Sequence, residues 1–309
     1  MIWNEVNYIM NNYWRGVIMT LIAAVCWGIM SPIAKVLANA GVSLMSVMAF
    51  RAFFVVFTLG PYIYFKKGSD VFKLDRNMLY FYLISGILSV VFTGGGFLMS
   101  LNYLSVAEAL IIHYTFPLVT LLGSLYITHE KPSLLQVVSG FLIVAGVYLG
   151  MVGGEKTFSG ISIPGLMWGS LGVIGMSGQA LVARRVCKGQ KTDQLTLLFF
   201  AHLFGGIIIV AGKSPIAGWG DTTNLNLLLF GLMAFQSLCG SLLAYGFFYT
   251  ALKYVPAATA SLLCTLEIVV AVGLTSLLLA QSPSMQEVLG CGVIIVAIIF
   301  AAARPSELE

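Results

Sequence analysis

The side chains that could do chemistry in this chain of 309 residues are a few ionisable groups, set within or at the edge of long apolar stretches. The four most informative are Arg51, Glu108, His113 and Glu267. A charge at the centre of a hydrocarbon layer costs about 3 kcal/mol by the lower estimates, so such residues usually face a polar cavity or a partner. Their chemistry is the binding of charged groups and the exchange of protons.

Arg51 and Glu267 offer opposite charges. Arg51 has five N–H donors that would clamp a carboxylate or phosphate in a cavity. The alternative is a structural arginine that bonds helix-end carbonyls or pairs with Glu267. Glu267 lies about midway along its apolar stretch and could take up and release a proton, which makes it a candidate for proton coupling. Its alternative role is that of an anchor between helices.

Glu108 and His113 share one apolar stretch. They are five residues apart, which is about 140° around a helix, so they do not face the same way. His113 could line a cavity and exchange a proton near neutral pH, or it could simply bond a neighbouring helix. Glu108 lies close to the outer corner. If it faces inward it would bind a substrate's ammonium group, and otherwise it is solvated.

Aromatic and hydroxyl side chains add to these candidates. Trp27 lies in the middle of its stretch, away from the membrane interface where tryptophan is common. Its ring could stack on a substrate or cover an ammonium group, or it could pack in the core. Further along, hydroxyl groups recur every four residues on a face expected to look inward, because lipid offers them no partner; hydrogen bonds between helices are the alternative. That face holds Ser237, Ser241, Tyr245 and Tyr249, with the amide of Gln236 beside it.

The elements that must position these residues are membrane-spanning helices. The chain is 59% hydrophobic and 9% charged, with a mean hydropathy of +0.96, whereas soluble domains have about 25% charged residues. A helix needs about 20 apolar residues to cross a bilayer. This requirement is met ten times, which predicts an all-α, polytopic membrane protein with ten transmembrane helices. The predicted spans are residues 16–37, 44–65, 79–101, 106–128, 134–152, 163–184, 195–211, 225–251, 257–280 and 287–303.

The two halves of the chain repeat each other. Adding 151 to the numbers of Leu101 and Tyr103 gives Leu252 and Tyr254, and the same offset relates Arg51 to His202. The first and sixth spans match at an offset of 149, which pairs Gly16 with Gly165 and Lys35 with Arg184. Five spans per half is an odd number, so the halves must insert in opposite directions. Such inverted repeats usually hold a substrate site at the midplane between them.

Loop charges set the expected orientation, because Lys and Arg collect on the cytoplasmic side. With the N-terminus inside, the outer loops keep only Lys35, Lys156 and Lys213, so both termini are predicted to be cytoplasmic. The expected organisation is a cytoplasmic segment 1–15, a first five-helix repeat 16–152, an external linker 153–162, a second five-helix repeat 163–303 and a cytoplasmic tail 304–309.

Some residues are expected to bend or loosen the helices. Pro32 and Pro117 lie inside spans and should kink them, and the run Gly94, Gly95 and Gly96 should allow close packing or bending of a helix that moves. Gly146 and Gly150 form a small-residue pair that suits either a dimer face or, more commonly, packing within one chain.

Four spans carry recognisable motifs: A-V-C-W-G in the first, M-A-F-R-A-F-F in the second, an internal proline before the acidic end Glu130 in the fourth, and T-L-E-I in the ninth. Together they resemble the EamA-domain exporters of the drug/metabolite transporter superfamily. The family usually has Leu-Glu-Pro at the last of these motifs, so Ile268 stands where a proline is expected, and Gln281 stands where the acidic end of the first half would recur. The resemblance implies a ten-helix inverted-repeat transporter of small metabolites, often an exporter of amino acids.

We therefore expect a secondary or facilitative transporter that exports a small polar metabolite, such as an amino acid, by alternating access around a midplane cavity. The alternative is uptake of a cationic or quaternary-ammonium metabolite such as choline. The sequence has no motif for carboxylate-pair, zinc or nucleotide chemistry, so we expect no enzyme, no cofactor and no metal site. The expected partners are a small-molecule substrate, the lipid bilayer and, as a further hypothesis, protons, but no nucleic acid. The expected location is a bacterial plasma (inner) membrane, as a monomer or homodimer.

Overall fold

The computed structural model describes residues 2–152, 162–188, 193–223, 225–279 and 282–303. These residues form helices and contain no strand. Among them, ten helical segments are long and apolar enough to cross a membrane, which confirms the predicted all-α fold with ten spans. The spans are Met10–Asn39, Leu44–Lys67, Arg76–Ser100, Val106–Thr128, Leu134–Met151, Ile163–Cys187, Gln194–Ile216, Leu227–Ala251, Ala257–Leu277 and Met285–Ala302.

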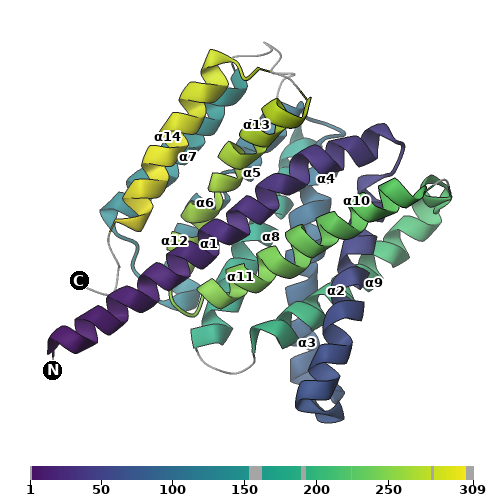
Figure 1. Ribbon diagram of the computed structural model, residues 1–309, viewed down its shortest axis with the longest axis horizontal. Coiled ribbons are helices and arrows are strands. Elements are labelled where there is room, and N and C mark those ends of the chain that lie inside the picture. The colour runs from purple at the N-terminus through teal and green to yellow at the C-terminus, as the bar shows by residue number, and fades with distance from the viewer. Residues whose placement is uncertain (1, 153–161, 189–192, 224, 280–281, 304–309) are drawn as a thin grey trace.

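Six spans are single helices (Figure 1), and four are built from shorter segments. The single helices are α1 (Ile2–Asn39), α2 (Leu44–Lys67), α7 (Leu134–Val152), α8 (Ile163–Lys188), α9 (Gln194–Ile216) and α14 (Met285–Ala302). The third span contains α3 (Arg76–Gly86), η2 (Ile87–Gly96) and α4 (Phe97–Ser100), and the fourth contains α5 (Val106–His113), α6 (Phe116–Gly123) and η3 (Ser124–Thr128). The eighth contains α10 (Leu227–Ser237), η5 (Leu238–Leu243) and α11 (Ala244–Ala251), and the ninth contains α12 (Ala257–Cys264) and α13 (Leu266–Leu279). Short 3₁₀ turns, η1 (Ser69–Phe72) and η4 (Gly220–Thr222), precede the third and eighth spans.

The predicted segments outside the spans are only partly visible. The first helix begins at Ile2 rather than at residue 16, so most of the predicted N-terminal segment is helical. Residues 153–161 of the linker and the tail 304–309 lie outside the described residues, as do Lys156 and Gln281. The division of the chain into the proposed repeats therefore remains a prediction at these edges.

The repeat is visible in the irregular parts of the helices. The third and eighth spans each contain a π-helical segment, and these begin at Ile87 and Leu238, which are 151 residues apart. The N-caps of these spans, Asp75 and Asn226, show the same offset, and each accepts a backbone N–H three residues on. The two halves thus share local geometry as well as hydropathy.

The fourth and ninth spans both break near their middle, at Tyr114–Thr115 and at Thr265. Pro117 explains the first break, because it has no N–H with which to bond the carbonyl of His113. Ile268 is the counterpart of Pro117 at the offset of 151. Its N–H bonds the Thr265 carbonyl instead of continuing the α-helical pattern, so the second break is kept without a proline.

Each half packs across the other. Helix α1 lies against the eighth and ninth spans, and α8 lies against the third and fourth. Helix α2 packs along α9 at one side of the bundle, and α7 packs along α14 at the opposite side (Figure 1). A Cβ on Gly146 would lie 3.0 Å from the Gly290 carbonyl oxygen, so the small-residue pair serves packing within the chain.

Glycine contacts confirm the two offsets. A Cβ on Gly16 would meet Tyr254 and Val255, and a Cβ on Gly165 would meet Tyr103 and Leu104. Both contacts let a helix lie directly on the corner between two spans of the other half.

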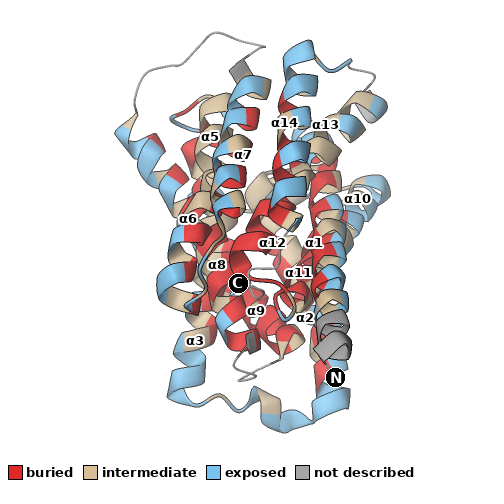
Figure 2. Ribbon diagram, turned by 90° about the vertical axis from the view of Figure 1, so that its left-hand side faces the viewer, coloured by how far each residue is buried: buried red, intermediate tan, exposed pale blue. Residues whose placement is uncertain are grey.

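The densest core lies in the half of the bundle that contains the N-terminus (Figure 2). Leu252, Val255 and Leu262, around the corner of the eighth and ninth spans, are fully buried. The counterpart corner between the third and fourth spans is largely intermediate or exposed. The bundle is therefore sealed on the N-terminal side and looser on the other.

Candidate functional site

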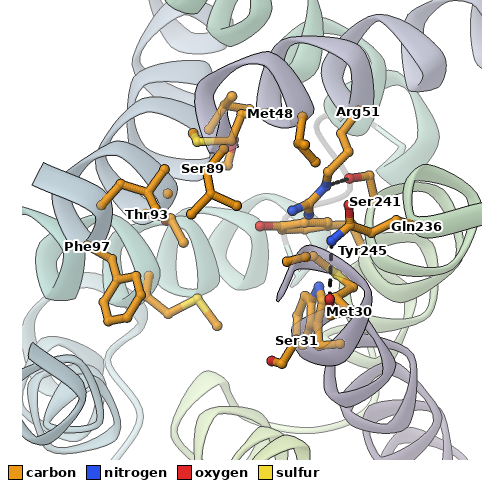
Figure 3. A pocket seen from close by; sticks show the side chains of 18 of the residues that line it. Met30, Ser31, Met48, Arg51, Ser89, Thr93, Phe97, Gln236, Ser241 and Tyr245 are labelled. Carbon is orange, nitrogen blue, oxygen red and sulfur yellow. Dashed lines mark hydrogen bonds between the residues drawn. The ribbon is translucent and has the colours of Figure 1, made fainter. Parts of the chain in front are cut away.

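A cavity of about 310 Å³ lies between the two halves, lined by eight of the ten spans. The cavity extends from the middle of the bundle toward the side away from the N-terminus. Leu44, the first residue of α2, lies on that side and is part of the lining. Seven of the side chains proposed from sequence line it: Trp27, Arg51, His113, Gln236, Ser241, Tyr245 and Glu267. Figure 3 shows one wall of this site, where Arg51, Gln236, Ser241 and Tyr245 lie close together.

Arg51 projects from α2 onto the π-helical part of the eighth span. Its Nε donates to the Ser241 hydroxyl at 2.8 Å, and a terminal nitrogen lies 3.5 Å from the Gly240 carbonyl oxygen. No ion pair among the described residues joins Arg51 to Glu267. The guanidinium is thus held in place by neutral groups and keeps its charge available to the cavity.

The π-helical segment η5 supplies this wall with an acceptor. The N–H of Ala244 bonds Cys239 instead of Gly240, its α-helical partner, which leaves the Gly240 carbonyl for other donors. Trp27 Nε1 donates to it at 3.0 Å. The indole ring also meets Tyr245 edge-on, with 5.2 Å between the ring centroids. Trp27 is therefore both a cavity residue and a fixed contact between the two halves.

Gln236 is held from one side only. Its Nε2 donates to the Met30 carbonyl at 3.2 Å, while its buried Oε1 has no partner in the described part of the chain. A buried acceptor without a donor costs about 1–3 kcal/mol. The amide therefore gains stability in any state that brings a donor to Oε1.

Glu267 lies in the first turn of α13, directly after the break of the ninth span. Its Oε1 accepts the Tyr114 hydroxyl at 3.0 Å. The start of a half-helix favours a negative charge through its unpaired N–H groups. Glu267 is thus both anchored to the fourth span and part of the cavity wall.

His113 ends α5 at the break of the fourth span. Its ring packs edge-on against Phe97, with centroids 5.2 Å apart. Its Nδ1 is buried without a hydrogen-bond partner among the described residues, and the side chain lines the cavity. The predicted alternative, a bond to a neighbouring helix, is not seen for this nitrogen.

Glu108 is not brought together with the other candidates. It forms a capping box with Ser105, in which its carboxylate accepts the Ser105 N–H at 2.8 Å and the Ser105 hydroxyl accepts the Glu108 N–H. It is absent from the cavity lining. The sequence S-V-A-E is a capping-box pattern, so this role could have been read from the residues.

The residues proposed for bending behave differently from one another. Gly94 and Gly96 lie in η2 against Met48 and Gly172, where a Cβ would approach to 2.5 Å, whereas a Cβ on Gly95 would meet nothing within 4 Å. Pro32 lies within α1, which continues past it, and Pro117 follows the break of the fourth span.

The structure adds cavity residues that the sequence analysis missed. Tyr114 was missed because it lies at the helix break, where the helical period no longer predicts the direction of a side chain. His202 lines the cavity beside Tyr245, with 5.4 Å between ring centroids; its relation to Arg51 through the repeat was the signal for it. Ser89 and Thr93 contribute hydroxyl-bearing side chains from the third span.

Acidic residues outside the spans tie α2 to α9 at both ends. Asp221 accepts hydrogen bonds from the Ser46 hydroxyl, from Lys213 and from the Ser43 N–H. Burial alone would raise the pKa of Asp221, but these hydrogen bonds outweigh it and hold the pKa well below its usual range. At the other end Asp193 binds Lys67 and Thr196. Its pKa is lowered because these contacts outweigh the opposing effect of burial.

Among the described residues, no group of three or more His, Cys, Asp and Glu side chains is placed to hold a metal ion. The cavity instead combines one cation, one carboxyl group, two imidazoles, an amide and hydroxyls. This set suits reversible binding of a polar molecule.

Comparison with known proteins agrees with this arrangement. A model of the EamA-like transporter family matches residues 14–152 and, a second time, residues 163–303. A WAT1-related protein of Arabidopsis thaliana is 24% identical over 136 residues, which span 44% of this chain and 40% of the plant protein. A solved crystal structure superposes with a TM-score of 0.75 at 14% identity, over 95% of this chain and 98% of that one; it supports the fold alone.

Proposed function

Because the chain belongs to the EamA-like transporter family, we propose that it carries a small polar metabolite, such as an amino acid, across a membrane by alternating access. The chain is a multi-pass membrane protein of a transporter family. The direction of transport that we propose is export.

The observation that carries this proposal is the presence of Arg51 and Glu267 in one cavity without a bond between them. Two opposite charges that share a cavity would normally pair, because their attraction grows as water is excluded. Here each is held by neutral neighbours instead. A zwitterion would satisfy both at once.

We assign the groups of the substrate accordingly. The carboxylate binds the Arg51 guanidinium beside Ser241, where several N–H donors converge. The ammonium group binds Glu267, and Trp27 and Tyr245 supply aromatic faces for a cation or an apolar side chain. His113, with no partner for Nδ1, is a further candidate for contact with the substrate or for proton exchange. The π-helical glycines and Pro117 would let the third and fourth spans bend.

We further propose that the protein resides in a bacterial plasma membrane with both termini in the cytoplasm. The cavity is complete within one chain, so a monomer would suffice for transport. Cysteines at the exposed positions Ser69 and Gly220 would test the orientation, because they lie in η1 and η4 on opposite sides of the bundle. A membrane-impermeant thiol reagent applied to whole cells should label only Gly220→Cys. Labelling of Ser69→Cys instead would reverse the topology.

The function is tested by binding and flux with purified protein in liposomes. Thermal-shift screening against amino acids, amines, nucleosides and quaternary ammonium compounds should show stabilisation by an amino acid, since a ligand that binds only the folded state raises its melting temperature. Counterflow of that amino acid should then be lost in Arg51→Gln. The control Lys66→Gln changes an exposed lysine whose amino group bonds Tyr62 at the far end of α2.

The outcome for Arg51→Gln also separates the two candidate substrates. Loss of amino-acid binding supports the zwitterion. If the variant keeps full binding and the stabilising ligand is choline or another cation, the uptake alternative replaces our proposal.

A further inference from the structure

The cavity and the sealed side of the bundle contain two interfaces that correspond through the repeat, one open and one closed. The cavity separates the first span from the third, with Met30 and Ala34 on one wall and Leu98 on the other. The repeat offsets map these residues to Gln179, Ala183 and Tyr249, in the sixth and eighth spans. That second interface is closed and lies on the N-terminal side.

Three polar contacts between described residues hold the closed interface. The Tyr249 hydroxyl donates to Gln179 Oε1 at 3.4 Å, and the Cys187 thiol lies 3.6 Å from the Tyr249 carbonyl oxygen. At its end, Arg184 donates to the Leu252 carbonyl at 2.7 Å. The same guanidinium also binds Glu130, with 2.7 and 2.9 Å from two of its nitrogens to Oε1. Arg184 is only 2% exposed.

The open interface contains the counterparts of Arg184 and Leu252, but these do not form the corresponding hydrogen bond. Lys35 is the counterpart of Arg184; it is exposed and directly follows Ala34, which lines the cavity. Leu101 is the counterpart of Leu252, and the turn that it begins has the same hydrogen bonds: Asn102 to Met99 and Tyr103 to Ser100 repeat Lys253 to Thr250 and Tyr254 to Ala251. Within the described residues, no hydrogen bond to the Leu101 carbonyl is seen outside the regular helices. The acceptor is therefore already in place and lacks its donor.

We propose that Lys35 is the latch of the cavity mouth and that it closes the first and third spans by donating to the Leu101 carbonyl. Closure makes that interface resemble the present one between the sixth and eighth spans, while Arg184 releases Leu252. This inference rests on the proposed transport cycle and names the residues that switch it. Inverted repeats provide for such an exchange, because either half can adopt the arrangement of the other.

The two latches differ in strength. Arg184 bonds a carboxylate and a carbonyl in a buried setting, whereas Lys35 would bond a carbonyl at a solvated mouth. Both donors are ionised, but Arg184 makes an additional ion pair with Glu130, and the attraction between charges is stronger in a buried setting than in water. The N-terminal seal is therefore the more stable of the two, which agrees with the state seen here.

The experiment uses a cysteine at Ala34 as a reporter of the mouth. Ala34 is partly exposed in the cavity, while its counterpart Ala183 is 1% exposed in the closed interface. Reaction of Ala34→Cys with a charged maleimide should therefore be fast in the open state and slow in the closed one. The native cysteines are replaced first, with serine at Cys187 to keep a donor to Tyr249; the others are Cys26, Cys239, Cys264 and Cys291.

Weakening the N-terminal seal should close the mouth. We expect Arg184→Gln to slow labelling of Ala34→Cys by about tenfold, the effect of losing about 1.4 kcal/mol of charged hydrogen bonding. Adding Lys35→Met to Arg184→Gln should restore most of the labelling rate. The control Lys66→Met, at the far end of α2, should change neither rate.

Two results would overturn the latch: labelling that does not change in Arg184→Gln, or a double variant that stays as slow as the single one. If Arg184→Gln does not give a monodisperse protein, Glu130→Gln with and without Lys35→Met replaces it, since this change keeps the arginine and weakens only its ion pair. The labelling test is independent of substrate. A protein that transports no amino acid but shows the labelling pattern contradicts the proposed function and keeps the latch, while normal transport without the pattern contradicts the latch alone.

Discussion

The hydroxyl of Tyr114 donates to Oε1 of Glu267 at 3.0 Å and so joins the two helix breaks of the molecule. Tyr114 lies at the break of the fourth span, and Glu267 follows the break of the ninth span. The two breaks are at equivalent positions in the two repeats. The bond therefore holds a cavity carboxylate in a fixed direction and links it to the bending point of the other half. Tyr114 acts on any ligand of Glu267 through this carboxylate.

Removing that hydroxyl should weaken binding of the substrate's ammonium group. We expect Tyr114→Phe to lower affinity for an amino acid at least about tenfold, since a hydrogen bond to a charged group contributes about 1.5–3 kcal/mol. Affinity for the N-acetylated analogue, which has no ammonium group, should already be weak and should not fall further. Isothermal titration of both ligands measures the difference. Tyr126→Phe is the control, because Tyr126 is 78% exposed on the same span; equal losses for both ligands would argue against the positioning role.

Two neighbouring glycines in η2 should respond oppositely to the same substitution. A Cβ on Gly96 would lie 2.5 Å from the Gly172 backbone nitrogen, whereas one on Gly95 would meet nothing within 4 Å. Forcing an extra carbon into a packed site costs about 1–3 kcal/mol. Gly96→Ala should therefore lower the melting temperature in detergent by several degrees, and Gly95→Ala should leave it unchanged or raised. Equal effects would show that the segment can move away from α8.

The repeat offset was the most informative feature of the sequence, because it relates residues whose surroundings the structure later shows to match. It paired Arg51 with His202, and both line the cavity. It could not reveal which half is closed, since Lys35 and Arg184 have similar chemistry and differ only in their contacts. That asymmetry is a property of the packed state.

Side-chain direction was easiest to predict where the helices are regular. Trp27 lies in α1, a single continuous helix, and reaches the cavity. Tyr114 follows a break that shifts the helical phase, so no period placed it. Glu108 was considered for the cavity because its charge drew attention, although the serine three residues before it predicts a helix cap.

Acid should remove the contribution of Asp221 to stability. Its folded-state pKa is lowered, so its hydrogen bonds stabilise the protein above the unfolded pKa of about 3.9 and lose this effect as the pH falls toward the folded pKa. Asp221→Asn should therefore lower the melting temperature at neutral pH, and the difference from the parent protein should shrink below about pH 4.

Asp70 provides the matched control for this change. It is the counterpart of Asp221 in the first repeat, but its side chain is 85% exposed and its ion pair is with Lys73, three residues away. Exposed pairs contribute little, so Asp70→Asn should leave the melting temperature unchanged at every pH. A destabilisation by Asp221→Asn that persists unchanged into acid would mean that the carboxylate charge is not what binds α2 to η4.

Proton coupling should depend on Glu267 and not on Glu108. Glu267 lines the cavity within reach of the Tyr114 hydroxyl, whereas Glu108 caps the start of α5 outside it. In liposomes with an imposed pH gradient, substrate should accumulate against its own gradient with the parent protein and with Glu108→Gln. Glu267→Gln should still exchange substrate between the two sides but should no longer accumulate it, because a neutral amide cannot carry a proton. Flux that ignores the pH gradient in the parent protein would identify a facilitator and leave Glu267 the task of binding the ammonium group.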